Sequence, residues 1–360
     1  RNSSPFDAID SAGNANKNGG FDRNPVASFL TDPRTGAKIL SNASLTNAIS
    51  NSDTGLIQVN GLIDSGIDDS KHNYLDLFLM IGDNVYGDSK KEDLEELKLA
   101  YKIQKKNFQM MSLEFPFEAI WDDHDYGLND AGSEYPFKQK SKELFLNFWD
   151  IPSNDVRRSR EGIYFDFIYE INNKTLQILF LDTRTFRDKL KPSNNIGEQG
   201  KERYIPNTDS SLTILGVNQW SWIKKKLEYE VDFRVIVSSI QFLPVGHGWE
   251  SWNNFPYERE KLIEMIDETN LDQTLVISGD RHRAGIYKIE TESSKIIFEV
   301  TSSSLNASFP NEEEYGPLRI GNTFIEENYG LIILDSKNDH MTVNIKNING
   351  EIVRNLSVTN

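Results

Sequence analysis

Several hydrophobic runs of this sequence end in acidic residues, glutamine or histidine, which are residue types that bind metal ions and move protons. The run LVISGDRHRAG predicts a buried strand over 275–278, a turn at Gly279, and then Asp280 and His282. These two residues are two positions apart, so an extended backbone would direct both to one side. A carboxylate beside an imidazole at a strand end offers two ligands to a metal ion. The alternative is a capping aspartate beside a histidine in a polar network.

The run LDLFLMIGDNVYGD ends in a second such group. Gly82 permits a sharp exit from a strand. Asp83 follows directly, where one carboxylate could bridge two cations, and Tyr86 lies three residues further on. A phenolate is a hard anionic donor that suits trivalent iron. The alternative is an Asp–Asn turn with a partly buried tyrosine.

The run FEAIWDDHDYG places three carboxylates around one histidine. These carboxylates repel one another unless cations neutralise them. We predict Asp123 as a metal ligand and His124 as a general acid or a contact to a substrate oxygen. Asp125 is predicted to orient His124, and Asp122 could instead bond the backbone of the turn. A solvated acidic loop is the alternative.

The run LQILFLDTRTFR supplies cations to an acidic chain. Guanidinium groups at a strand end suit bidentate contact with phosphate oxygens, which makes Arg184 and Arg187 candidates for substrate binding. An equally weighted alternative is a structural ion pair of these arginines with Asp182 and Asp188.

Two further positions are candidates for contact with substrate. Gln241 ends the strand-like run VIVSSIQFLP, and Trp249 lies in the glycine-rich loop PVGHGWESW. A tryptophan in such a loop could line a substrate pocket. The alternative is that Trp249 packs against the protein and has a structural role only.

The elements that must position these groups alternate between strands and helices, which predicts an α/β protein. In open α/β sheets, sites gather at the carboxyl ends of strands, and the polar endings fit that rule. We therefore expect a mixed sheet sandwich flanked by helices, with one polar site along a sheet edge. Helices are predicted over 91–108, 141–149, 218–229 and 256–270, strands over 162–170, 175–181, 233–240, 274–278 and 296–301, and a closing hairpin over 329–335 and 341–348.

Composition limits the functions open to the chain. Its 360 residues are predicted to form an extended arm over 1–35 and a single domain over 36–360. A formal charge of −16 argues against a nucleic-acid partner, because phosphate backbones would be repelled over most of the surface. With no cysteine, the chain has no disulfide and no thiolate ligand. We also predict no membrane-spanning segment, since no apolar run approaches about 18 residues.

The motifs, taken in order, resemble the PhoD-like alkaline phosphatase/phosphodiesterase family of the metallophosphoesterase superfamily. The resemblance runs from about Leu75 to Leu305. It rests on IGDNVYGD, WDDHDYGLNDAG, FLDTRTFR, LGVNQWSWI, VSSIQ, NFPYERE and SGDRH. It implies a four-layer α/β/β/α metallophosphatase sandwich with mixed sheets and a metal cluster that hydrolyses phosphate esters.

The resemblance also implies roles for individual residues of this sequence. Asp83 corresponds to a bridging ligand. Tyr86 and His282 correspond to ligands of a ferric site, and Asp280 to a ligand of a second, divalent site. The remaining carried-over positions are the ligands Asp123 and Asn129, the catalytic histidine His124 and the phosphate-contacting arginine Arg184.

The sequence departs from the family at one ligand. The family usually begins its site with a cysteine after the first strand, where this chain has KILSNASLTN, and that alignment puts Asn42 at the site. An amide oxygen carries no charge, so a trivalent ion would lose one compensating anion. The implied cofactors are two or more metal ions, Fe3+ with Ca2+, and Zn2+, Mn2+ or Mg2+ are the alternatives.

We therefore predict a metal-dependent phosphoric ester hydrolase that acts on monoesters, diesters or both through a metal-activated hydroxide. Two alternatives stay open. One is a catalytically impaired binding protein on the same fold, and the other is a phospholipase-like diesterase acting on lipid headgroups. The family habit predicts a secreted, periplasmic or cell-surface protein. Oligomeric state is left open.

Overall fold

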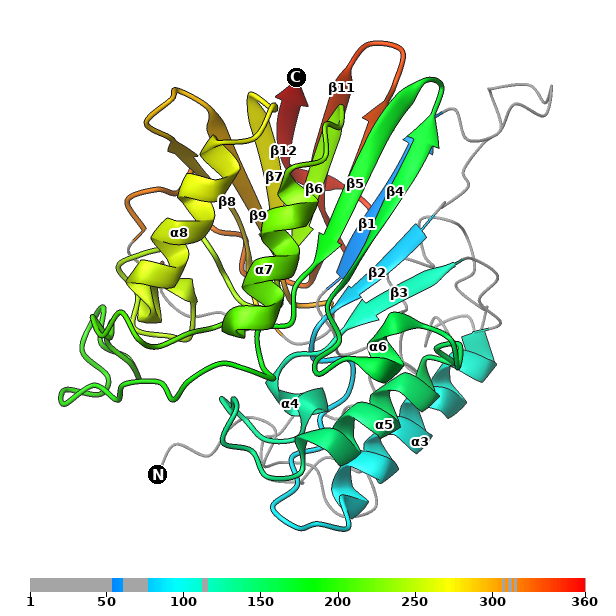
Figure 1. Ribbon diagram of the computed structural model, residues 1–360, viewed down its shortest axis with the longest axis vertical. Helices are drawn as coiled ribbons and strands as arrows, with labels where there is room; N and C mark the ends of the chain where they lie inside the picture. The colour runs from blue at the N-terminus through cyan, green and yellow to red at the C-terminus, as the bar shows by residue number, and fades with distance from the viewer. Residues whose placement is uncertain are drawn as a thin grey trace.

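Two six-stranded sheets form the protein in the computed structural model, which describes residues 54–60, 77–111, 116–305, 308–309, 313 and 316–359 (Figure 1). The first sheet has the order β12 (Ile352–Thr359), β11 (His340–Asn347), β10 (Asn328–Asp335), β1 (Thr54–Asn60), β2 (Leu77–Ile81) and β3 (Phe117–Ile120). The second has the order β4 (Phe165–Ile171), β5 (Lys174–Phe180), β6 (Phe233–Val237), β7 (Gln273–Ser278), β9 (Ile296–Ser302) and β8 (Ala284–Glu290).

Both sheets are mixed, as the sequence predicted. Strands β5, β6, β7 and β9 run parallel, and β4 and β8 pair antiparallel at the two edges. In the first sheet the parallel pairs are β1–β10 and β2–β3. Parallel neighbours share the edge at which they end, so β5, β6 and β7 end together, and so do β2 and β3.

Alternation of side chains along the parallel strands builds two cores. Along β6, Val235 faces a core that also contains Met80 and Val343 of the first sheet, so the two sheets pack face to face. The next residue, Ile236, faces the opposite core. Because both faces are covered, these strands are continuous hydrophobic runs rather than alternating ones.

The second core lies under two helices, α7 (Gly216–Leu227) and α8 (Pro256–Asp267), which cover the front of the second sheet in Figure 1. Two others, α3 (Glu95–Met111) and α5 (Lys138–Phe148), lie together beside β3. The α/β class is thereby confirmed, with two sheets and one helical layer in place. The predicted fourth layer, on the outer face of the first sheet, stays a prediction.

The long helices and the buried strands match the sequence prediction within a few residues. Strands β1, β8 and β12 were not predicted. The predicted arm over 1–35 lies outside the described residues, and the single-domain boundary at residue 36 stays a prediction. Among the helices of the described part of the chain, not one has the length and hydrophobicity needed to cross a lipid bilayer.

Helix α7 begins at a carboxylate supplied by its neighbour. Glu258 of α8 accepts hydrogen bonds from the backbone of Ile214 at 2.9 Å, from Thr213 Oγ1 at 2.8 Å and from Trp220 Nε1 at 2.6 Å. A helix N-terminus has unpaired N–H groups and a positive dipole, so a buried carboxylate stabilises it. This contact ties the motifs LGVNQWSWI and NFPYERE together.

We expect Glu258→Ala to lower the free energy of unfolding by about 2–3 kcal/mol, because several buried donors lose their acceptor. Glu260→Ala is the matched control on the same helix, since the side chain of Glu260 is 60% exposed. It should change stability by less than about 0.5 kcal/mol. Urea unfolding followed by circular dichroism measures both, and equal stabilities of the two variants would contradict the capping role.

Candidate metal centre

A hydrogen bond joins the ends of β3 and β5 beside the predicted polar site. Trp121, which follows β3, donates from Nε1 to Asp182 Oδ1 at 3.0 Å, and Asp182 follows β5. Gln219 of α7 holds the same residue, because its amide accepts from Asp182 N and donates to Asp182 O, each at 2.9 Å. Asp182 is therefore a structural junction between the two sheets.

A glycine is required where β2 joins this junction. Gly82 has φ +127°, and a Cβ there would lie 2.6 Å from Asp122 Cβ and 3.2 Å from Ser239 Cβ. Ser239 follows β6 and donates to Asp122 Oδ1 at 2.6 Å. Gly279, which follows β7, donates from its backbone to Ser239 O at 3.0 Å. The ends of five strands, β2, β3, β5, β6 and β7, thus meet around one point, as the rule for parallel sheets predicts.

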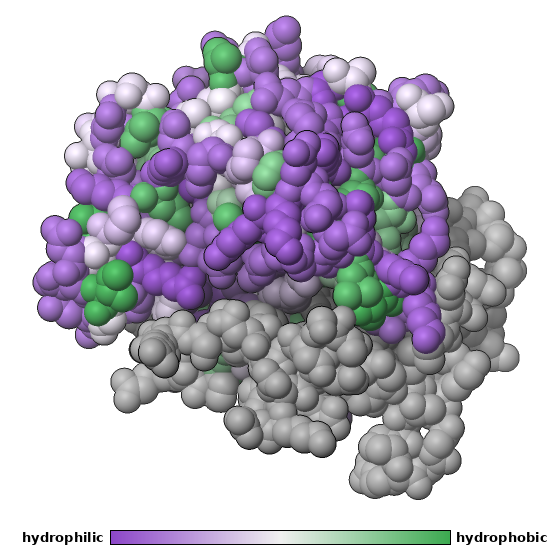
Figure 2. Space-filling view, turned by 90° about the horizontal axis from the view of Figure 1, so that it is seen from below, coloured by the Kyte–Doolittle hydropathy of each residue, from purple (hydrophilic) through white to green (hydrophobic). Residues whose placement is uncertain are grey.

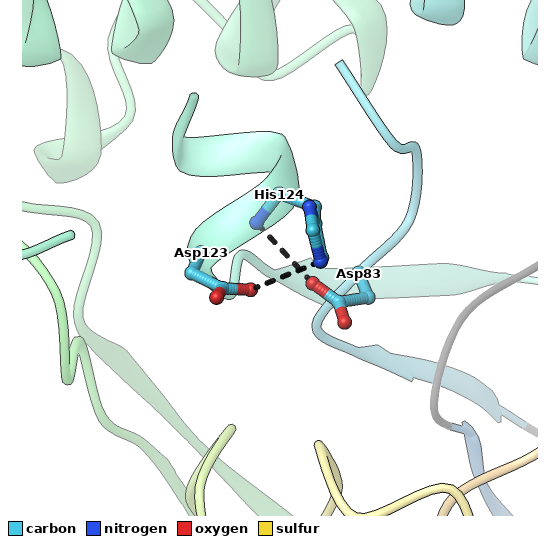
Figure 3. A group of neighbouring side chains, drawn as sticks. All are labelled: Asp83, Asp123 and His124. Atoms are coloured by element: carbon cyan, nitrogen blue, oxygen red, sulfur yellow. Dashed lines mark hydrogen bonds and ion pairs between the residues drawn. The ribbon is translucent and has the colours of Figure 1, made fainter. Parts of the chain in front are cut away.

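Three of the predicted functional residues converge there (Figure 3). Asp83, Asp123 and His124 each offer a ligand atom, and these atoms lie within 4.8 Å of one another. All three residues are buried. Asp123 Oδ2 accepts from Asp130 N at 2.5 Å, whereas Asp123 Oδ1 accepts no hydrogen bond from the described residues. A buried carboxylate oxygen without a donor, beside a second carboxylate, fits a bound cation.

His124 is held by a carboxylate that we did not predict. Its Nδ1 lies 2.7 Å from Asp88 Oδ2, and its Nε2 lies 4.0 Å from Asp123 Oδ1. Burial alone would lower the pKa of His124, but the carboxylates of Asp123 and Asp88 raise this pKa to about 9. Burial would likewise raise the pKa of Asp123, and the charges of His124 and Arg184 bring it below its usual range.

The orienting role predicted for Asp125 is wrong. Its Oδ1 accepts from Asp122 N at 2.6 Å, and its Oδ2 accepts from the side-chain amide of Asn84. Asp125 therefore fixes the backbone of the turn that starts α4 (Asp123–Tyr126). Burial raises its pKa well above the usual range. Asp88 lies in the quoted motif GDNVYGD, and its place five residues after Asp83 was the available signal.

Two of the other predicted ligands, Tyr86 and Asp280, lie near this group. Tyr86 Oη donates to Asp83 Oδ2 at 3.2 Å, and its ring centroid lies 4.3 Å from that of His124. Removal from water and the neighbouring Asp122 charge raise the pKa of Asp280 well above its usual range, so Asp280 lies within the electrostatic reach of the cluster. His282 stacks on Phe309, with 4.2 Å between ring centroids.

The prediction that an extended backbone directs Asp280 and His282 to one side is wrong, and the roles of both residues as ligands stay predictions. The φ angles of Asp280 and His282 are +68° and +52°, so the backbone at each of these two residues is left-handed and not extended. Asp83 also has a positive φ, +46°. Non-glycine residues rarely adopt this conformation, and such strain is concentrated at functional sites.

Two predicted ligands have less support. Asn129 follows α4, and its backbone donates to Asp88 Oδ1 at 2.5 Å. This contact places Asn129 beside the His124–Asp88 pair, and its role as a ligand stays a prediction. Asn42 lies outside the described residues.

The arginines predicted to bind phosphate are sequestered inside the protein. The side chain of Arg184 is 0% exposed, with Nη2 2.6 Å from Asp122 Oδ1 and Nη1 2.8 Å from Glu250 Oε2. Arg187, also 0% exposed, has Nε 3.0 Å from Glu250 Oε1. The structural alternative is therefore the correct one, but the partners are Asp122 and Glu250 and not Asp182 and Asp188. Direct phosphate contact by either arginine does not fit this geometry.

Gln241 is likewise buried, and its side chain holds the loop that contains His247 and Trp249. Its Oε1 lies 3.1 Å from His247 Nε2, and its Nε2 donates to Thr301 Oγ1 at 2.8 Å. A substrate contact by Gln241 therefore does not fit the structure. Trp249, in the loop that His247 holds, is only partly buried. Its predicted place near substrate stays a prediction.

A second acidic group adjoins the first and was missed. Asp123, Asp130 and Glu250 bring one carboxylate oxygen each within 4.8 Å. Glu250 is bound by two arginines, and Asp130 Oδ2 accepts from Arg203 Nη1 at 2.8 Å and from Tyr204 Oη at 2.7 Å. Buried arginines already compensate Glu250, and the partly exposed Arg203 pairs with Asp130. Asp130 lies in the quoted LNDAG segment, whereas no spacing signal identified Glu250.

Comparison with solved structures shows the fold. The structure described as "Structure of PhoD" matches 87% of this chain and 69% of that chain with a TM-score of 0.59 at 18% identity. A second, described as "GAP50 the anchor in the inner membrane complex of Plasmodium", matches 86% of this chain and 89% of that chain with a TM-score of 0.51 at 12% identity. At these identities the likeness concerns the fold alone.

The sequence comparisons identify the family. The chain belongs to the PhoD-like phosphatase family, whose model matches residues 67–357. It is 26% identical over 226 residues to alkaline phosphatase D of Bacillus subtilis (strain 168), which covers 55% of this chain. The matched part spans 36% of that relative's length, so about a third of it. The predicted resemblance is confirmed.

We expect Arg184→Ala to lower the free energy of unfolding by about 3–5 kcal/mol, because it leaves the buried carboxylates of Asp122 and Glu250 uncompensated. The matched control is Lys140→Ala, which breaks an exposed ion pair with Glu92, where the side chains are 53% and 73% exposed. That change should stay within about 1 kcal/mol. Thermal and urea unfolding measure both. Unchanged stability of Arg184→Ala would show that the ion pairs of Arg184 with Asp122 and Glu250 do not stabilise the fold.

Proposed function

We propose that this chain hydrolyses phosphate esters in a metal-dependent reaction. The observation that carries the proposal is the group of Asp83, Asp123 and His124, with a buried oxygen of Asp123 that accepts no hydrogen bond from the described residues. Family membership supports the reaction class.

Oxygen ligands and an imidazole suit hard and borderline cations, and the donor set fits them. Asp83 and Asp123 would hold the cations, with Tyr86 and His282 on a ferric ion and Asp280 and Asn129 on a divalent ion such as Ca2+. When bound, such ions supply Lewis acidity and lower the pKa of water, which provides a nucleophile near neutral pH. We propose Fe3+ and Ca2+ as the two ions.

His124 would act on the substrate through Nε2. Asp88 occupies Nδ1 at 2.7 Å, which fixes the ring and directs Nε2 toward the carboxylate of Asp123, 4.0 Å away. An imidazole oriented by a carboxylate can donate a proton to a leaving alkoxide. The ring of Tyr86 packs against it and restricts its rotation.

The substrate class is a small phosphate ester. Figure 2 shows hydrophilic residues over most of the described part of the face seen from below, with hydrophobic residues in separate patches. An enzyme that works on a lipid surface would be expected to present a continuous apolar area. The choice between monoester and diester, and the export of the chain, stay predictions.

We expect Asp83→Ala to lower hydrolysis of an aryl phosphate monoester and diester by about 100-fold or more, because changes outside the ligand set alone lower metal affinity or activity about 10–100-fold. The variant should also hold less metal by elemental analysis. The control is Asp209→Ala, which removes a carboxylate from an exposed turn. A wild-type protein that binds metal but hydrolyses neither ester would instead favour the binding-protein alternative.

Asp88→Asn should lower kcat by about 10–100-fold while KM changes little, since the substitution weakens the group that orients His124 and leaves Asp83 and Asp123 in place. Asp93→Asn, which alters an exposed carboxylate of the same loop, is the comparison. Steady-state kinetics with a chromogenic ester separates the two parameters. An unchanged kcat would show that the Asp88 carboxylate does not orient His124 for catalysis.

A further inference from the structure

The cations of the site divide into two sets that differ in exposure. Arg184 and Arg187 have side chains that are 0% exposed and bound to carboxylates. The side chain of Arg203 is 41% exposed. An anionic substrate arriving from solvent can therefore reach Arg203 and cannot reach Arg184 without breaking a buried ion pair.

Arg203 lies beside the metal-ligand residues. Its Nη1 donates to Asp130 Oδ2 at 2.8 Å, and Asp130 N donates to Asp123 Oδ2 at 2.5 Å. One residue thus separates Arg203 from a proposed ligand. The charge of Asp280, another proposed ligand, is among those that raise the pKa of Arg203.

Trp249 connects Arg203 to the strand-end turn at 280–282. The guanidinium carbon of Arg203 lies 5.3 Å from the centroid of the Trp249 ring, and that of Arg281 lies 5.1 Å from the same ring. Arg281 is the residue between Asp280 and His282. An aromatic ring attracts cations, so the indole holds the guanidinium of Arg203 on this side of the site.

The backbone beneath Arg203 is fixed. Arg203 N and Tyr204 N both donate to Gly248 O, at 2.9 Å and 2.7 Å. A Cβ at Gly248 would lie 2.4 Å from Glu202 N and 2.6 Å from Lys201 Cα, so only glycine permits this approach of the two loops. The loops carrying Arg203 and Trp249 therefore form one preorganised wall, and little ordering is left for binding.

Arg203 retains unused hydrogen-bonding capacity. A guanidinium has five N–H donors. Toward the described residues Arg203 donates one side-chain hydrogen bond, the bond to Asp130. Its planar arrangement of donors suits two oxygens of a phosphoryl group.

We propose that Arg203, held by Asp130 and Trp249, is the residue that binds the non-bridging oxygens of the substrate phosphoryl group and favours dianionic monoesters over monoanionic diesters. This inference rests on the proposed function and names its substrate class. A monoester has one more anionic oxygen than a diester, so it gains more from an exposed guanidinium.

The test uses the full chain and three variants. Arg203→Gln removes the guanidinium. Tyr204→Phe removes the other side-chain donor to Asp130 Oδ2 and leaves the guanidinium in place, so it reports a purely structural role through Asp130. Lys201→Gln removes a positive charge from the same loop, where the lysine is 46% exposed, and it is the control for net charge.

Two measurements are made on each protein, loaded with Fe3+ and Ca2+. Calorimetric titration with inorganic phosphate measures anion binding without turnover. Steady-state kinetics with an aryl phosphate monoester and the matching diester measures KM and kcat. For Arg203→Gln we expect phosphate binding about 10-fold weaker and a monoester KM about 10-fold higher, with a smaller rise for the diester.

Each outcome decides the proposal. Weaker phosphate binding in Arg203→Gln, with Tyr204→Phe and Lys201→Gln close to wild type, supports it, even if no ester is hydrolysed and the proposed function fails. Equal losses in Arg203→Gln and Tyr204→Phe overturn it in favour of a structural role. Active wild-type protein with unchanged phosphate binding and KM in Arg203→Gln overturns it while leaving the proposed function intact.

Discussion

The buried ion pair of Asp122 with Arg184 and Glu250 is the interaction on which the site depends. Asp122 follows β3, Arg184 follows β5, and Glu250 lies in the loop after β6, so one cation joins both sheets and a loop. A buried charge is destabilising unless it is paired and hydrogen-bonded, and here the side-chain exposures are 0%, 0% and 2%. The network therefore fixes the ends of β3 and β5 relative to the loop after β6. This arrangement positions Asp123 and His124, which follow Asp122 directly.

The same network explains why the site can bind cations at all. Asp122 is adjacent in sequence to Asp123, and Glu250 shares the second acidic group with it. Burial raises the pKa of Glu250 and the charges of Arg184 and Arg187 lower it, and the pKa that results is about 7. Arginines thus compensate Asp122 and Glu250 internally. Asp123 Oδ1, which faces Asp83 and His124, accepts no hydrogen bond from the described residues, and its charge is the one that suits a bound ion.

The sequence predicted the fold class, the meeting of strand ends and the group of Asp83, Asp123 and His124, because these follow from local patterns and from a rule about parallel strands. The partners of Arg184 could not be predicted in the same way. Asp122 is 62 residues away and Glu250 is 66 residues away, and their contacts depend on how the sheets pack. Local spacing favoured Asp182 and Asp188 for Arg184, and Asp125 for His124. The edge strand β12, with alternating and largely exposed residues, lacked the hydrophobic run that revealed β6 and β7.

The arginines show that residue type alone does not assign a role at such a site. A guanidinium can compensate a buried carboxylate or bind an incoming phosphate, and it does one or the other according to its access to water. Arg184 is enclosed by the ends of β3 and β5 and by the 247–250 loop. Its positive charge is therefore neutralised by buried carboxylates of the protein itself. Arg203 packs against the indole of Trp249, and close contacts with Gly248 hold the loop that carries Arg203. Its guanidinium is therefore accessible to solvent. Arginine therefore serves here both as the buried partner of strand-end carboxylates and as an accessible cation in the wall that it forms with Trp249. The packing of the 247–250 loop determines which of the two roles each arginine has.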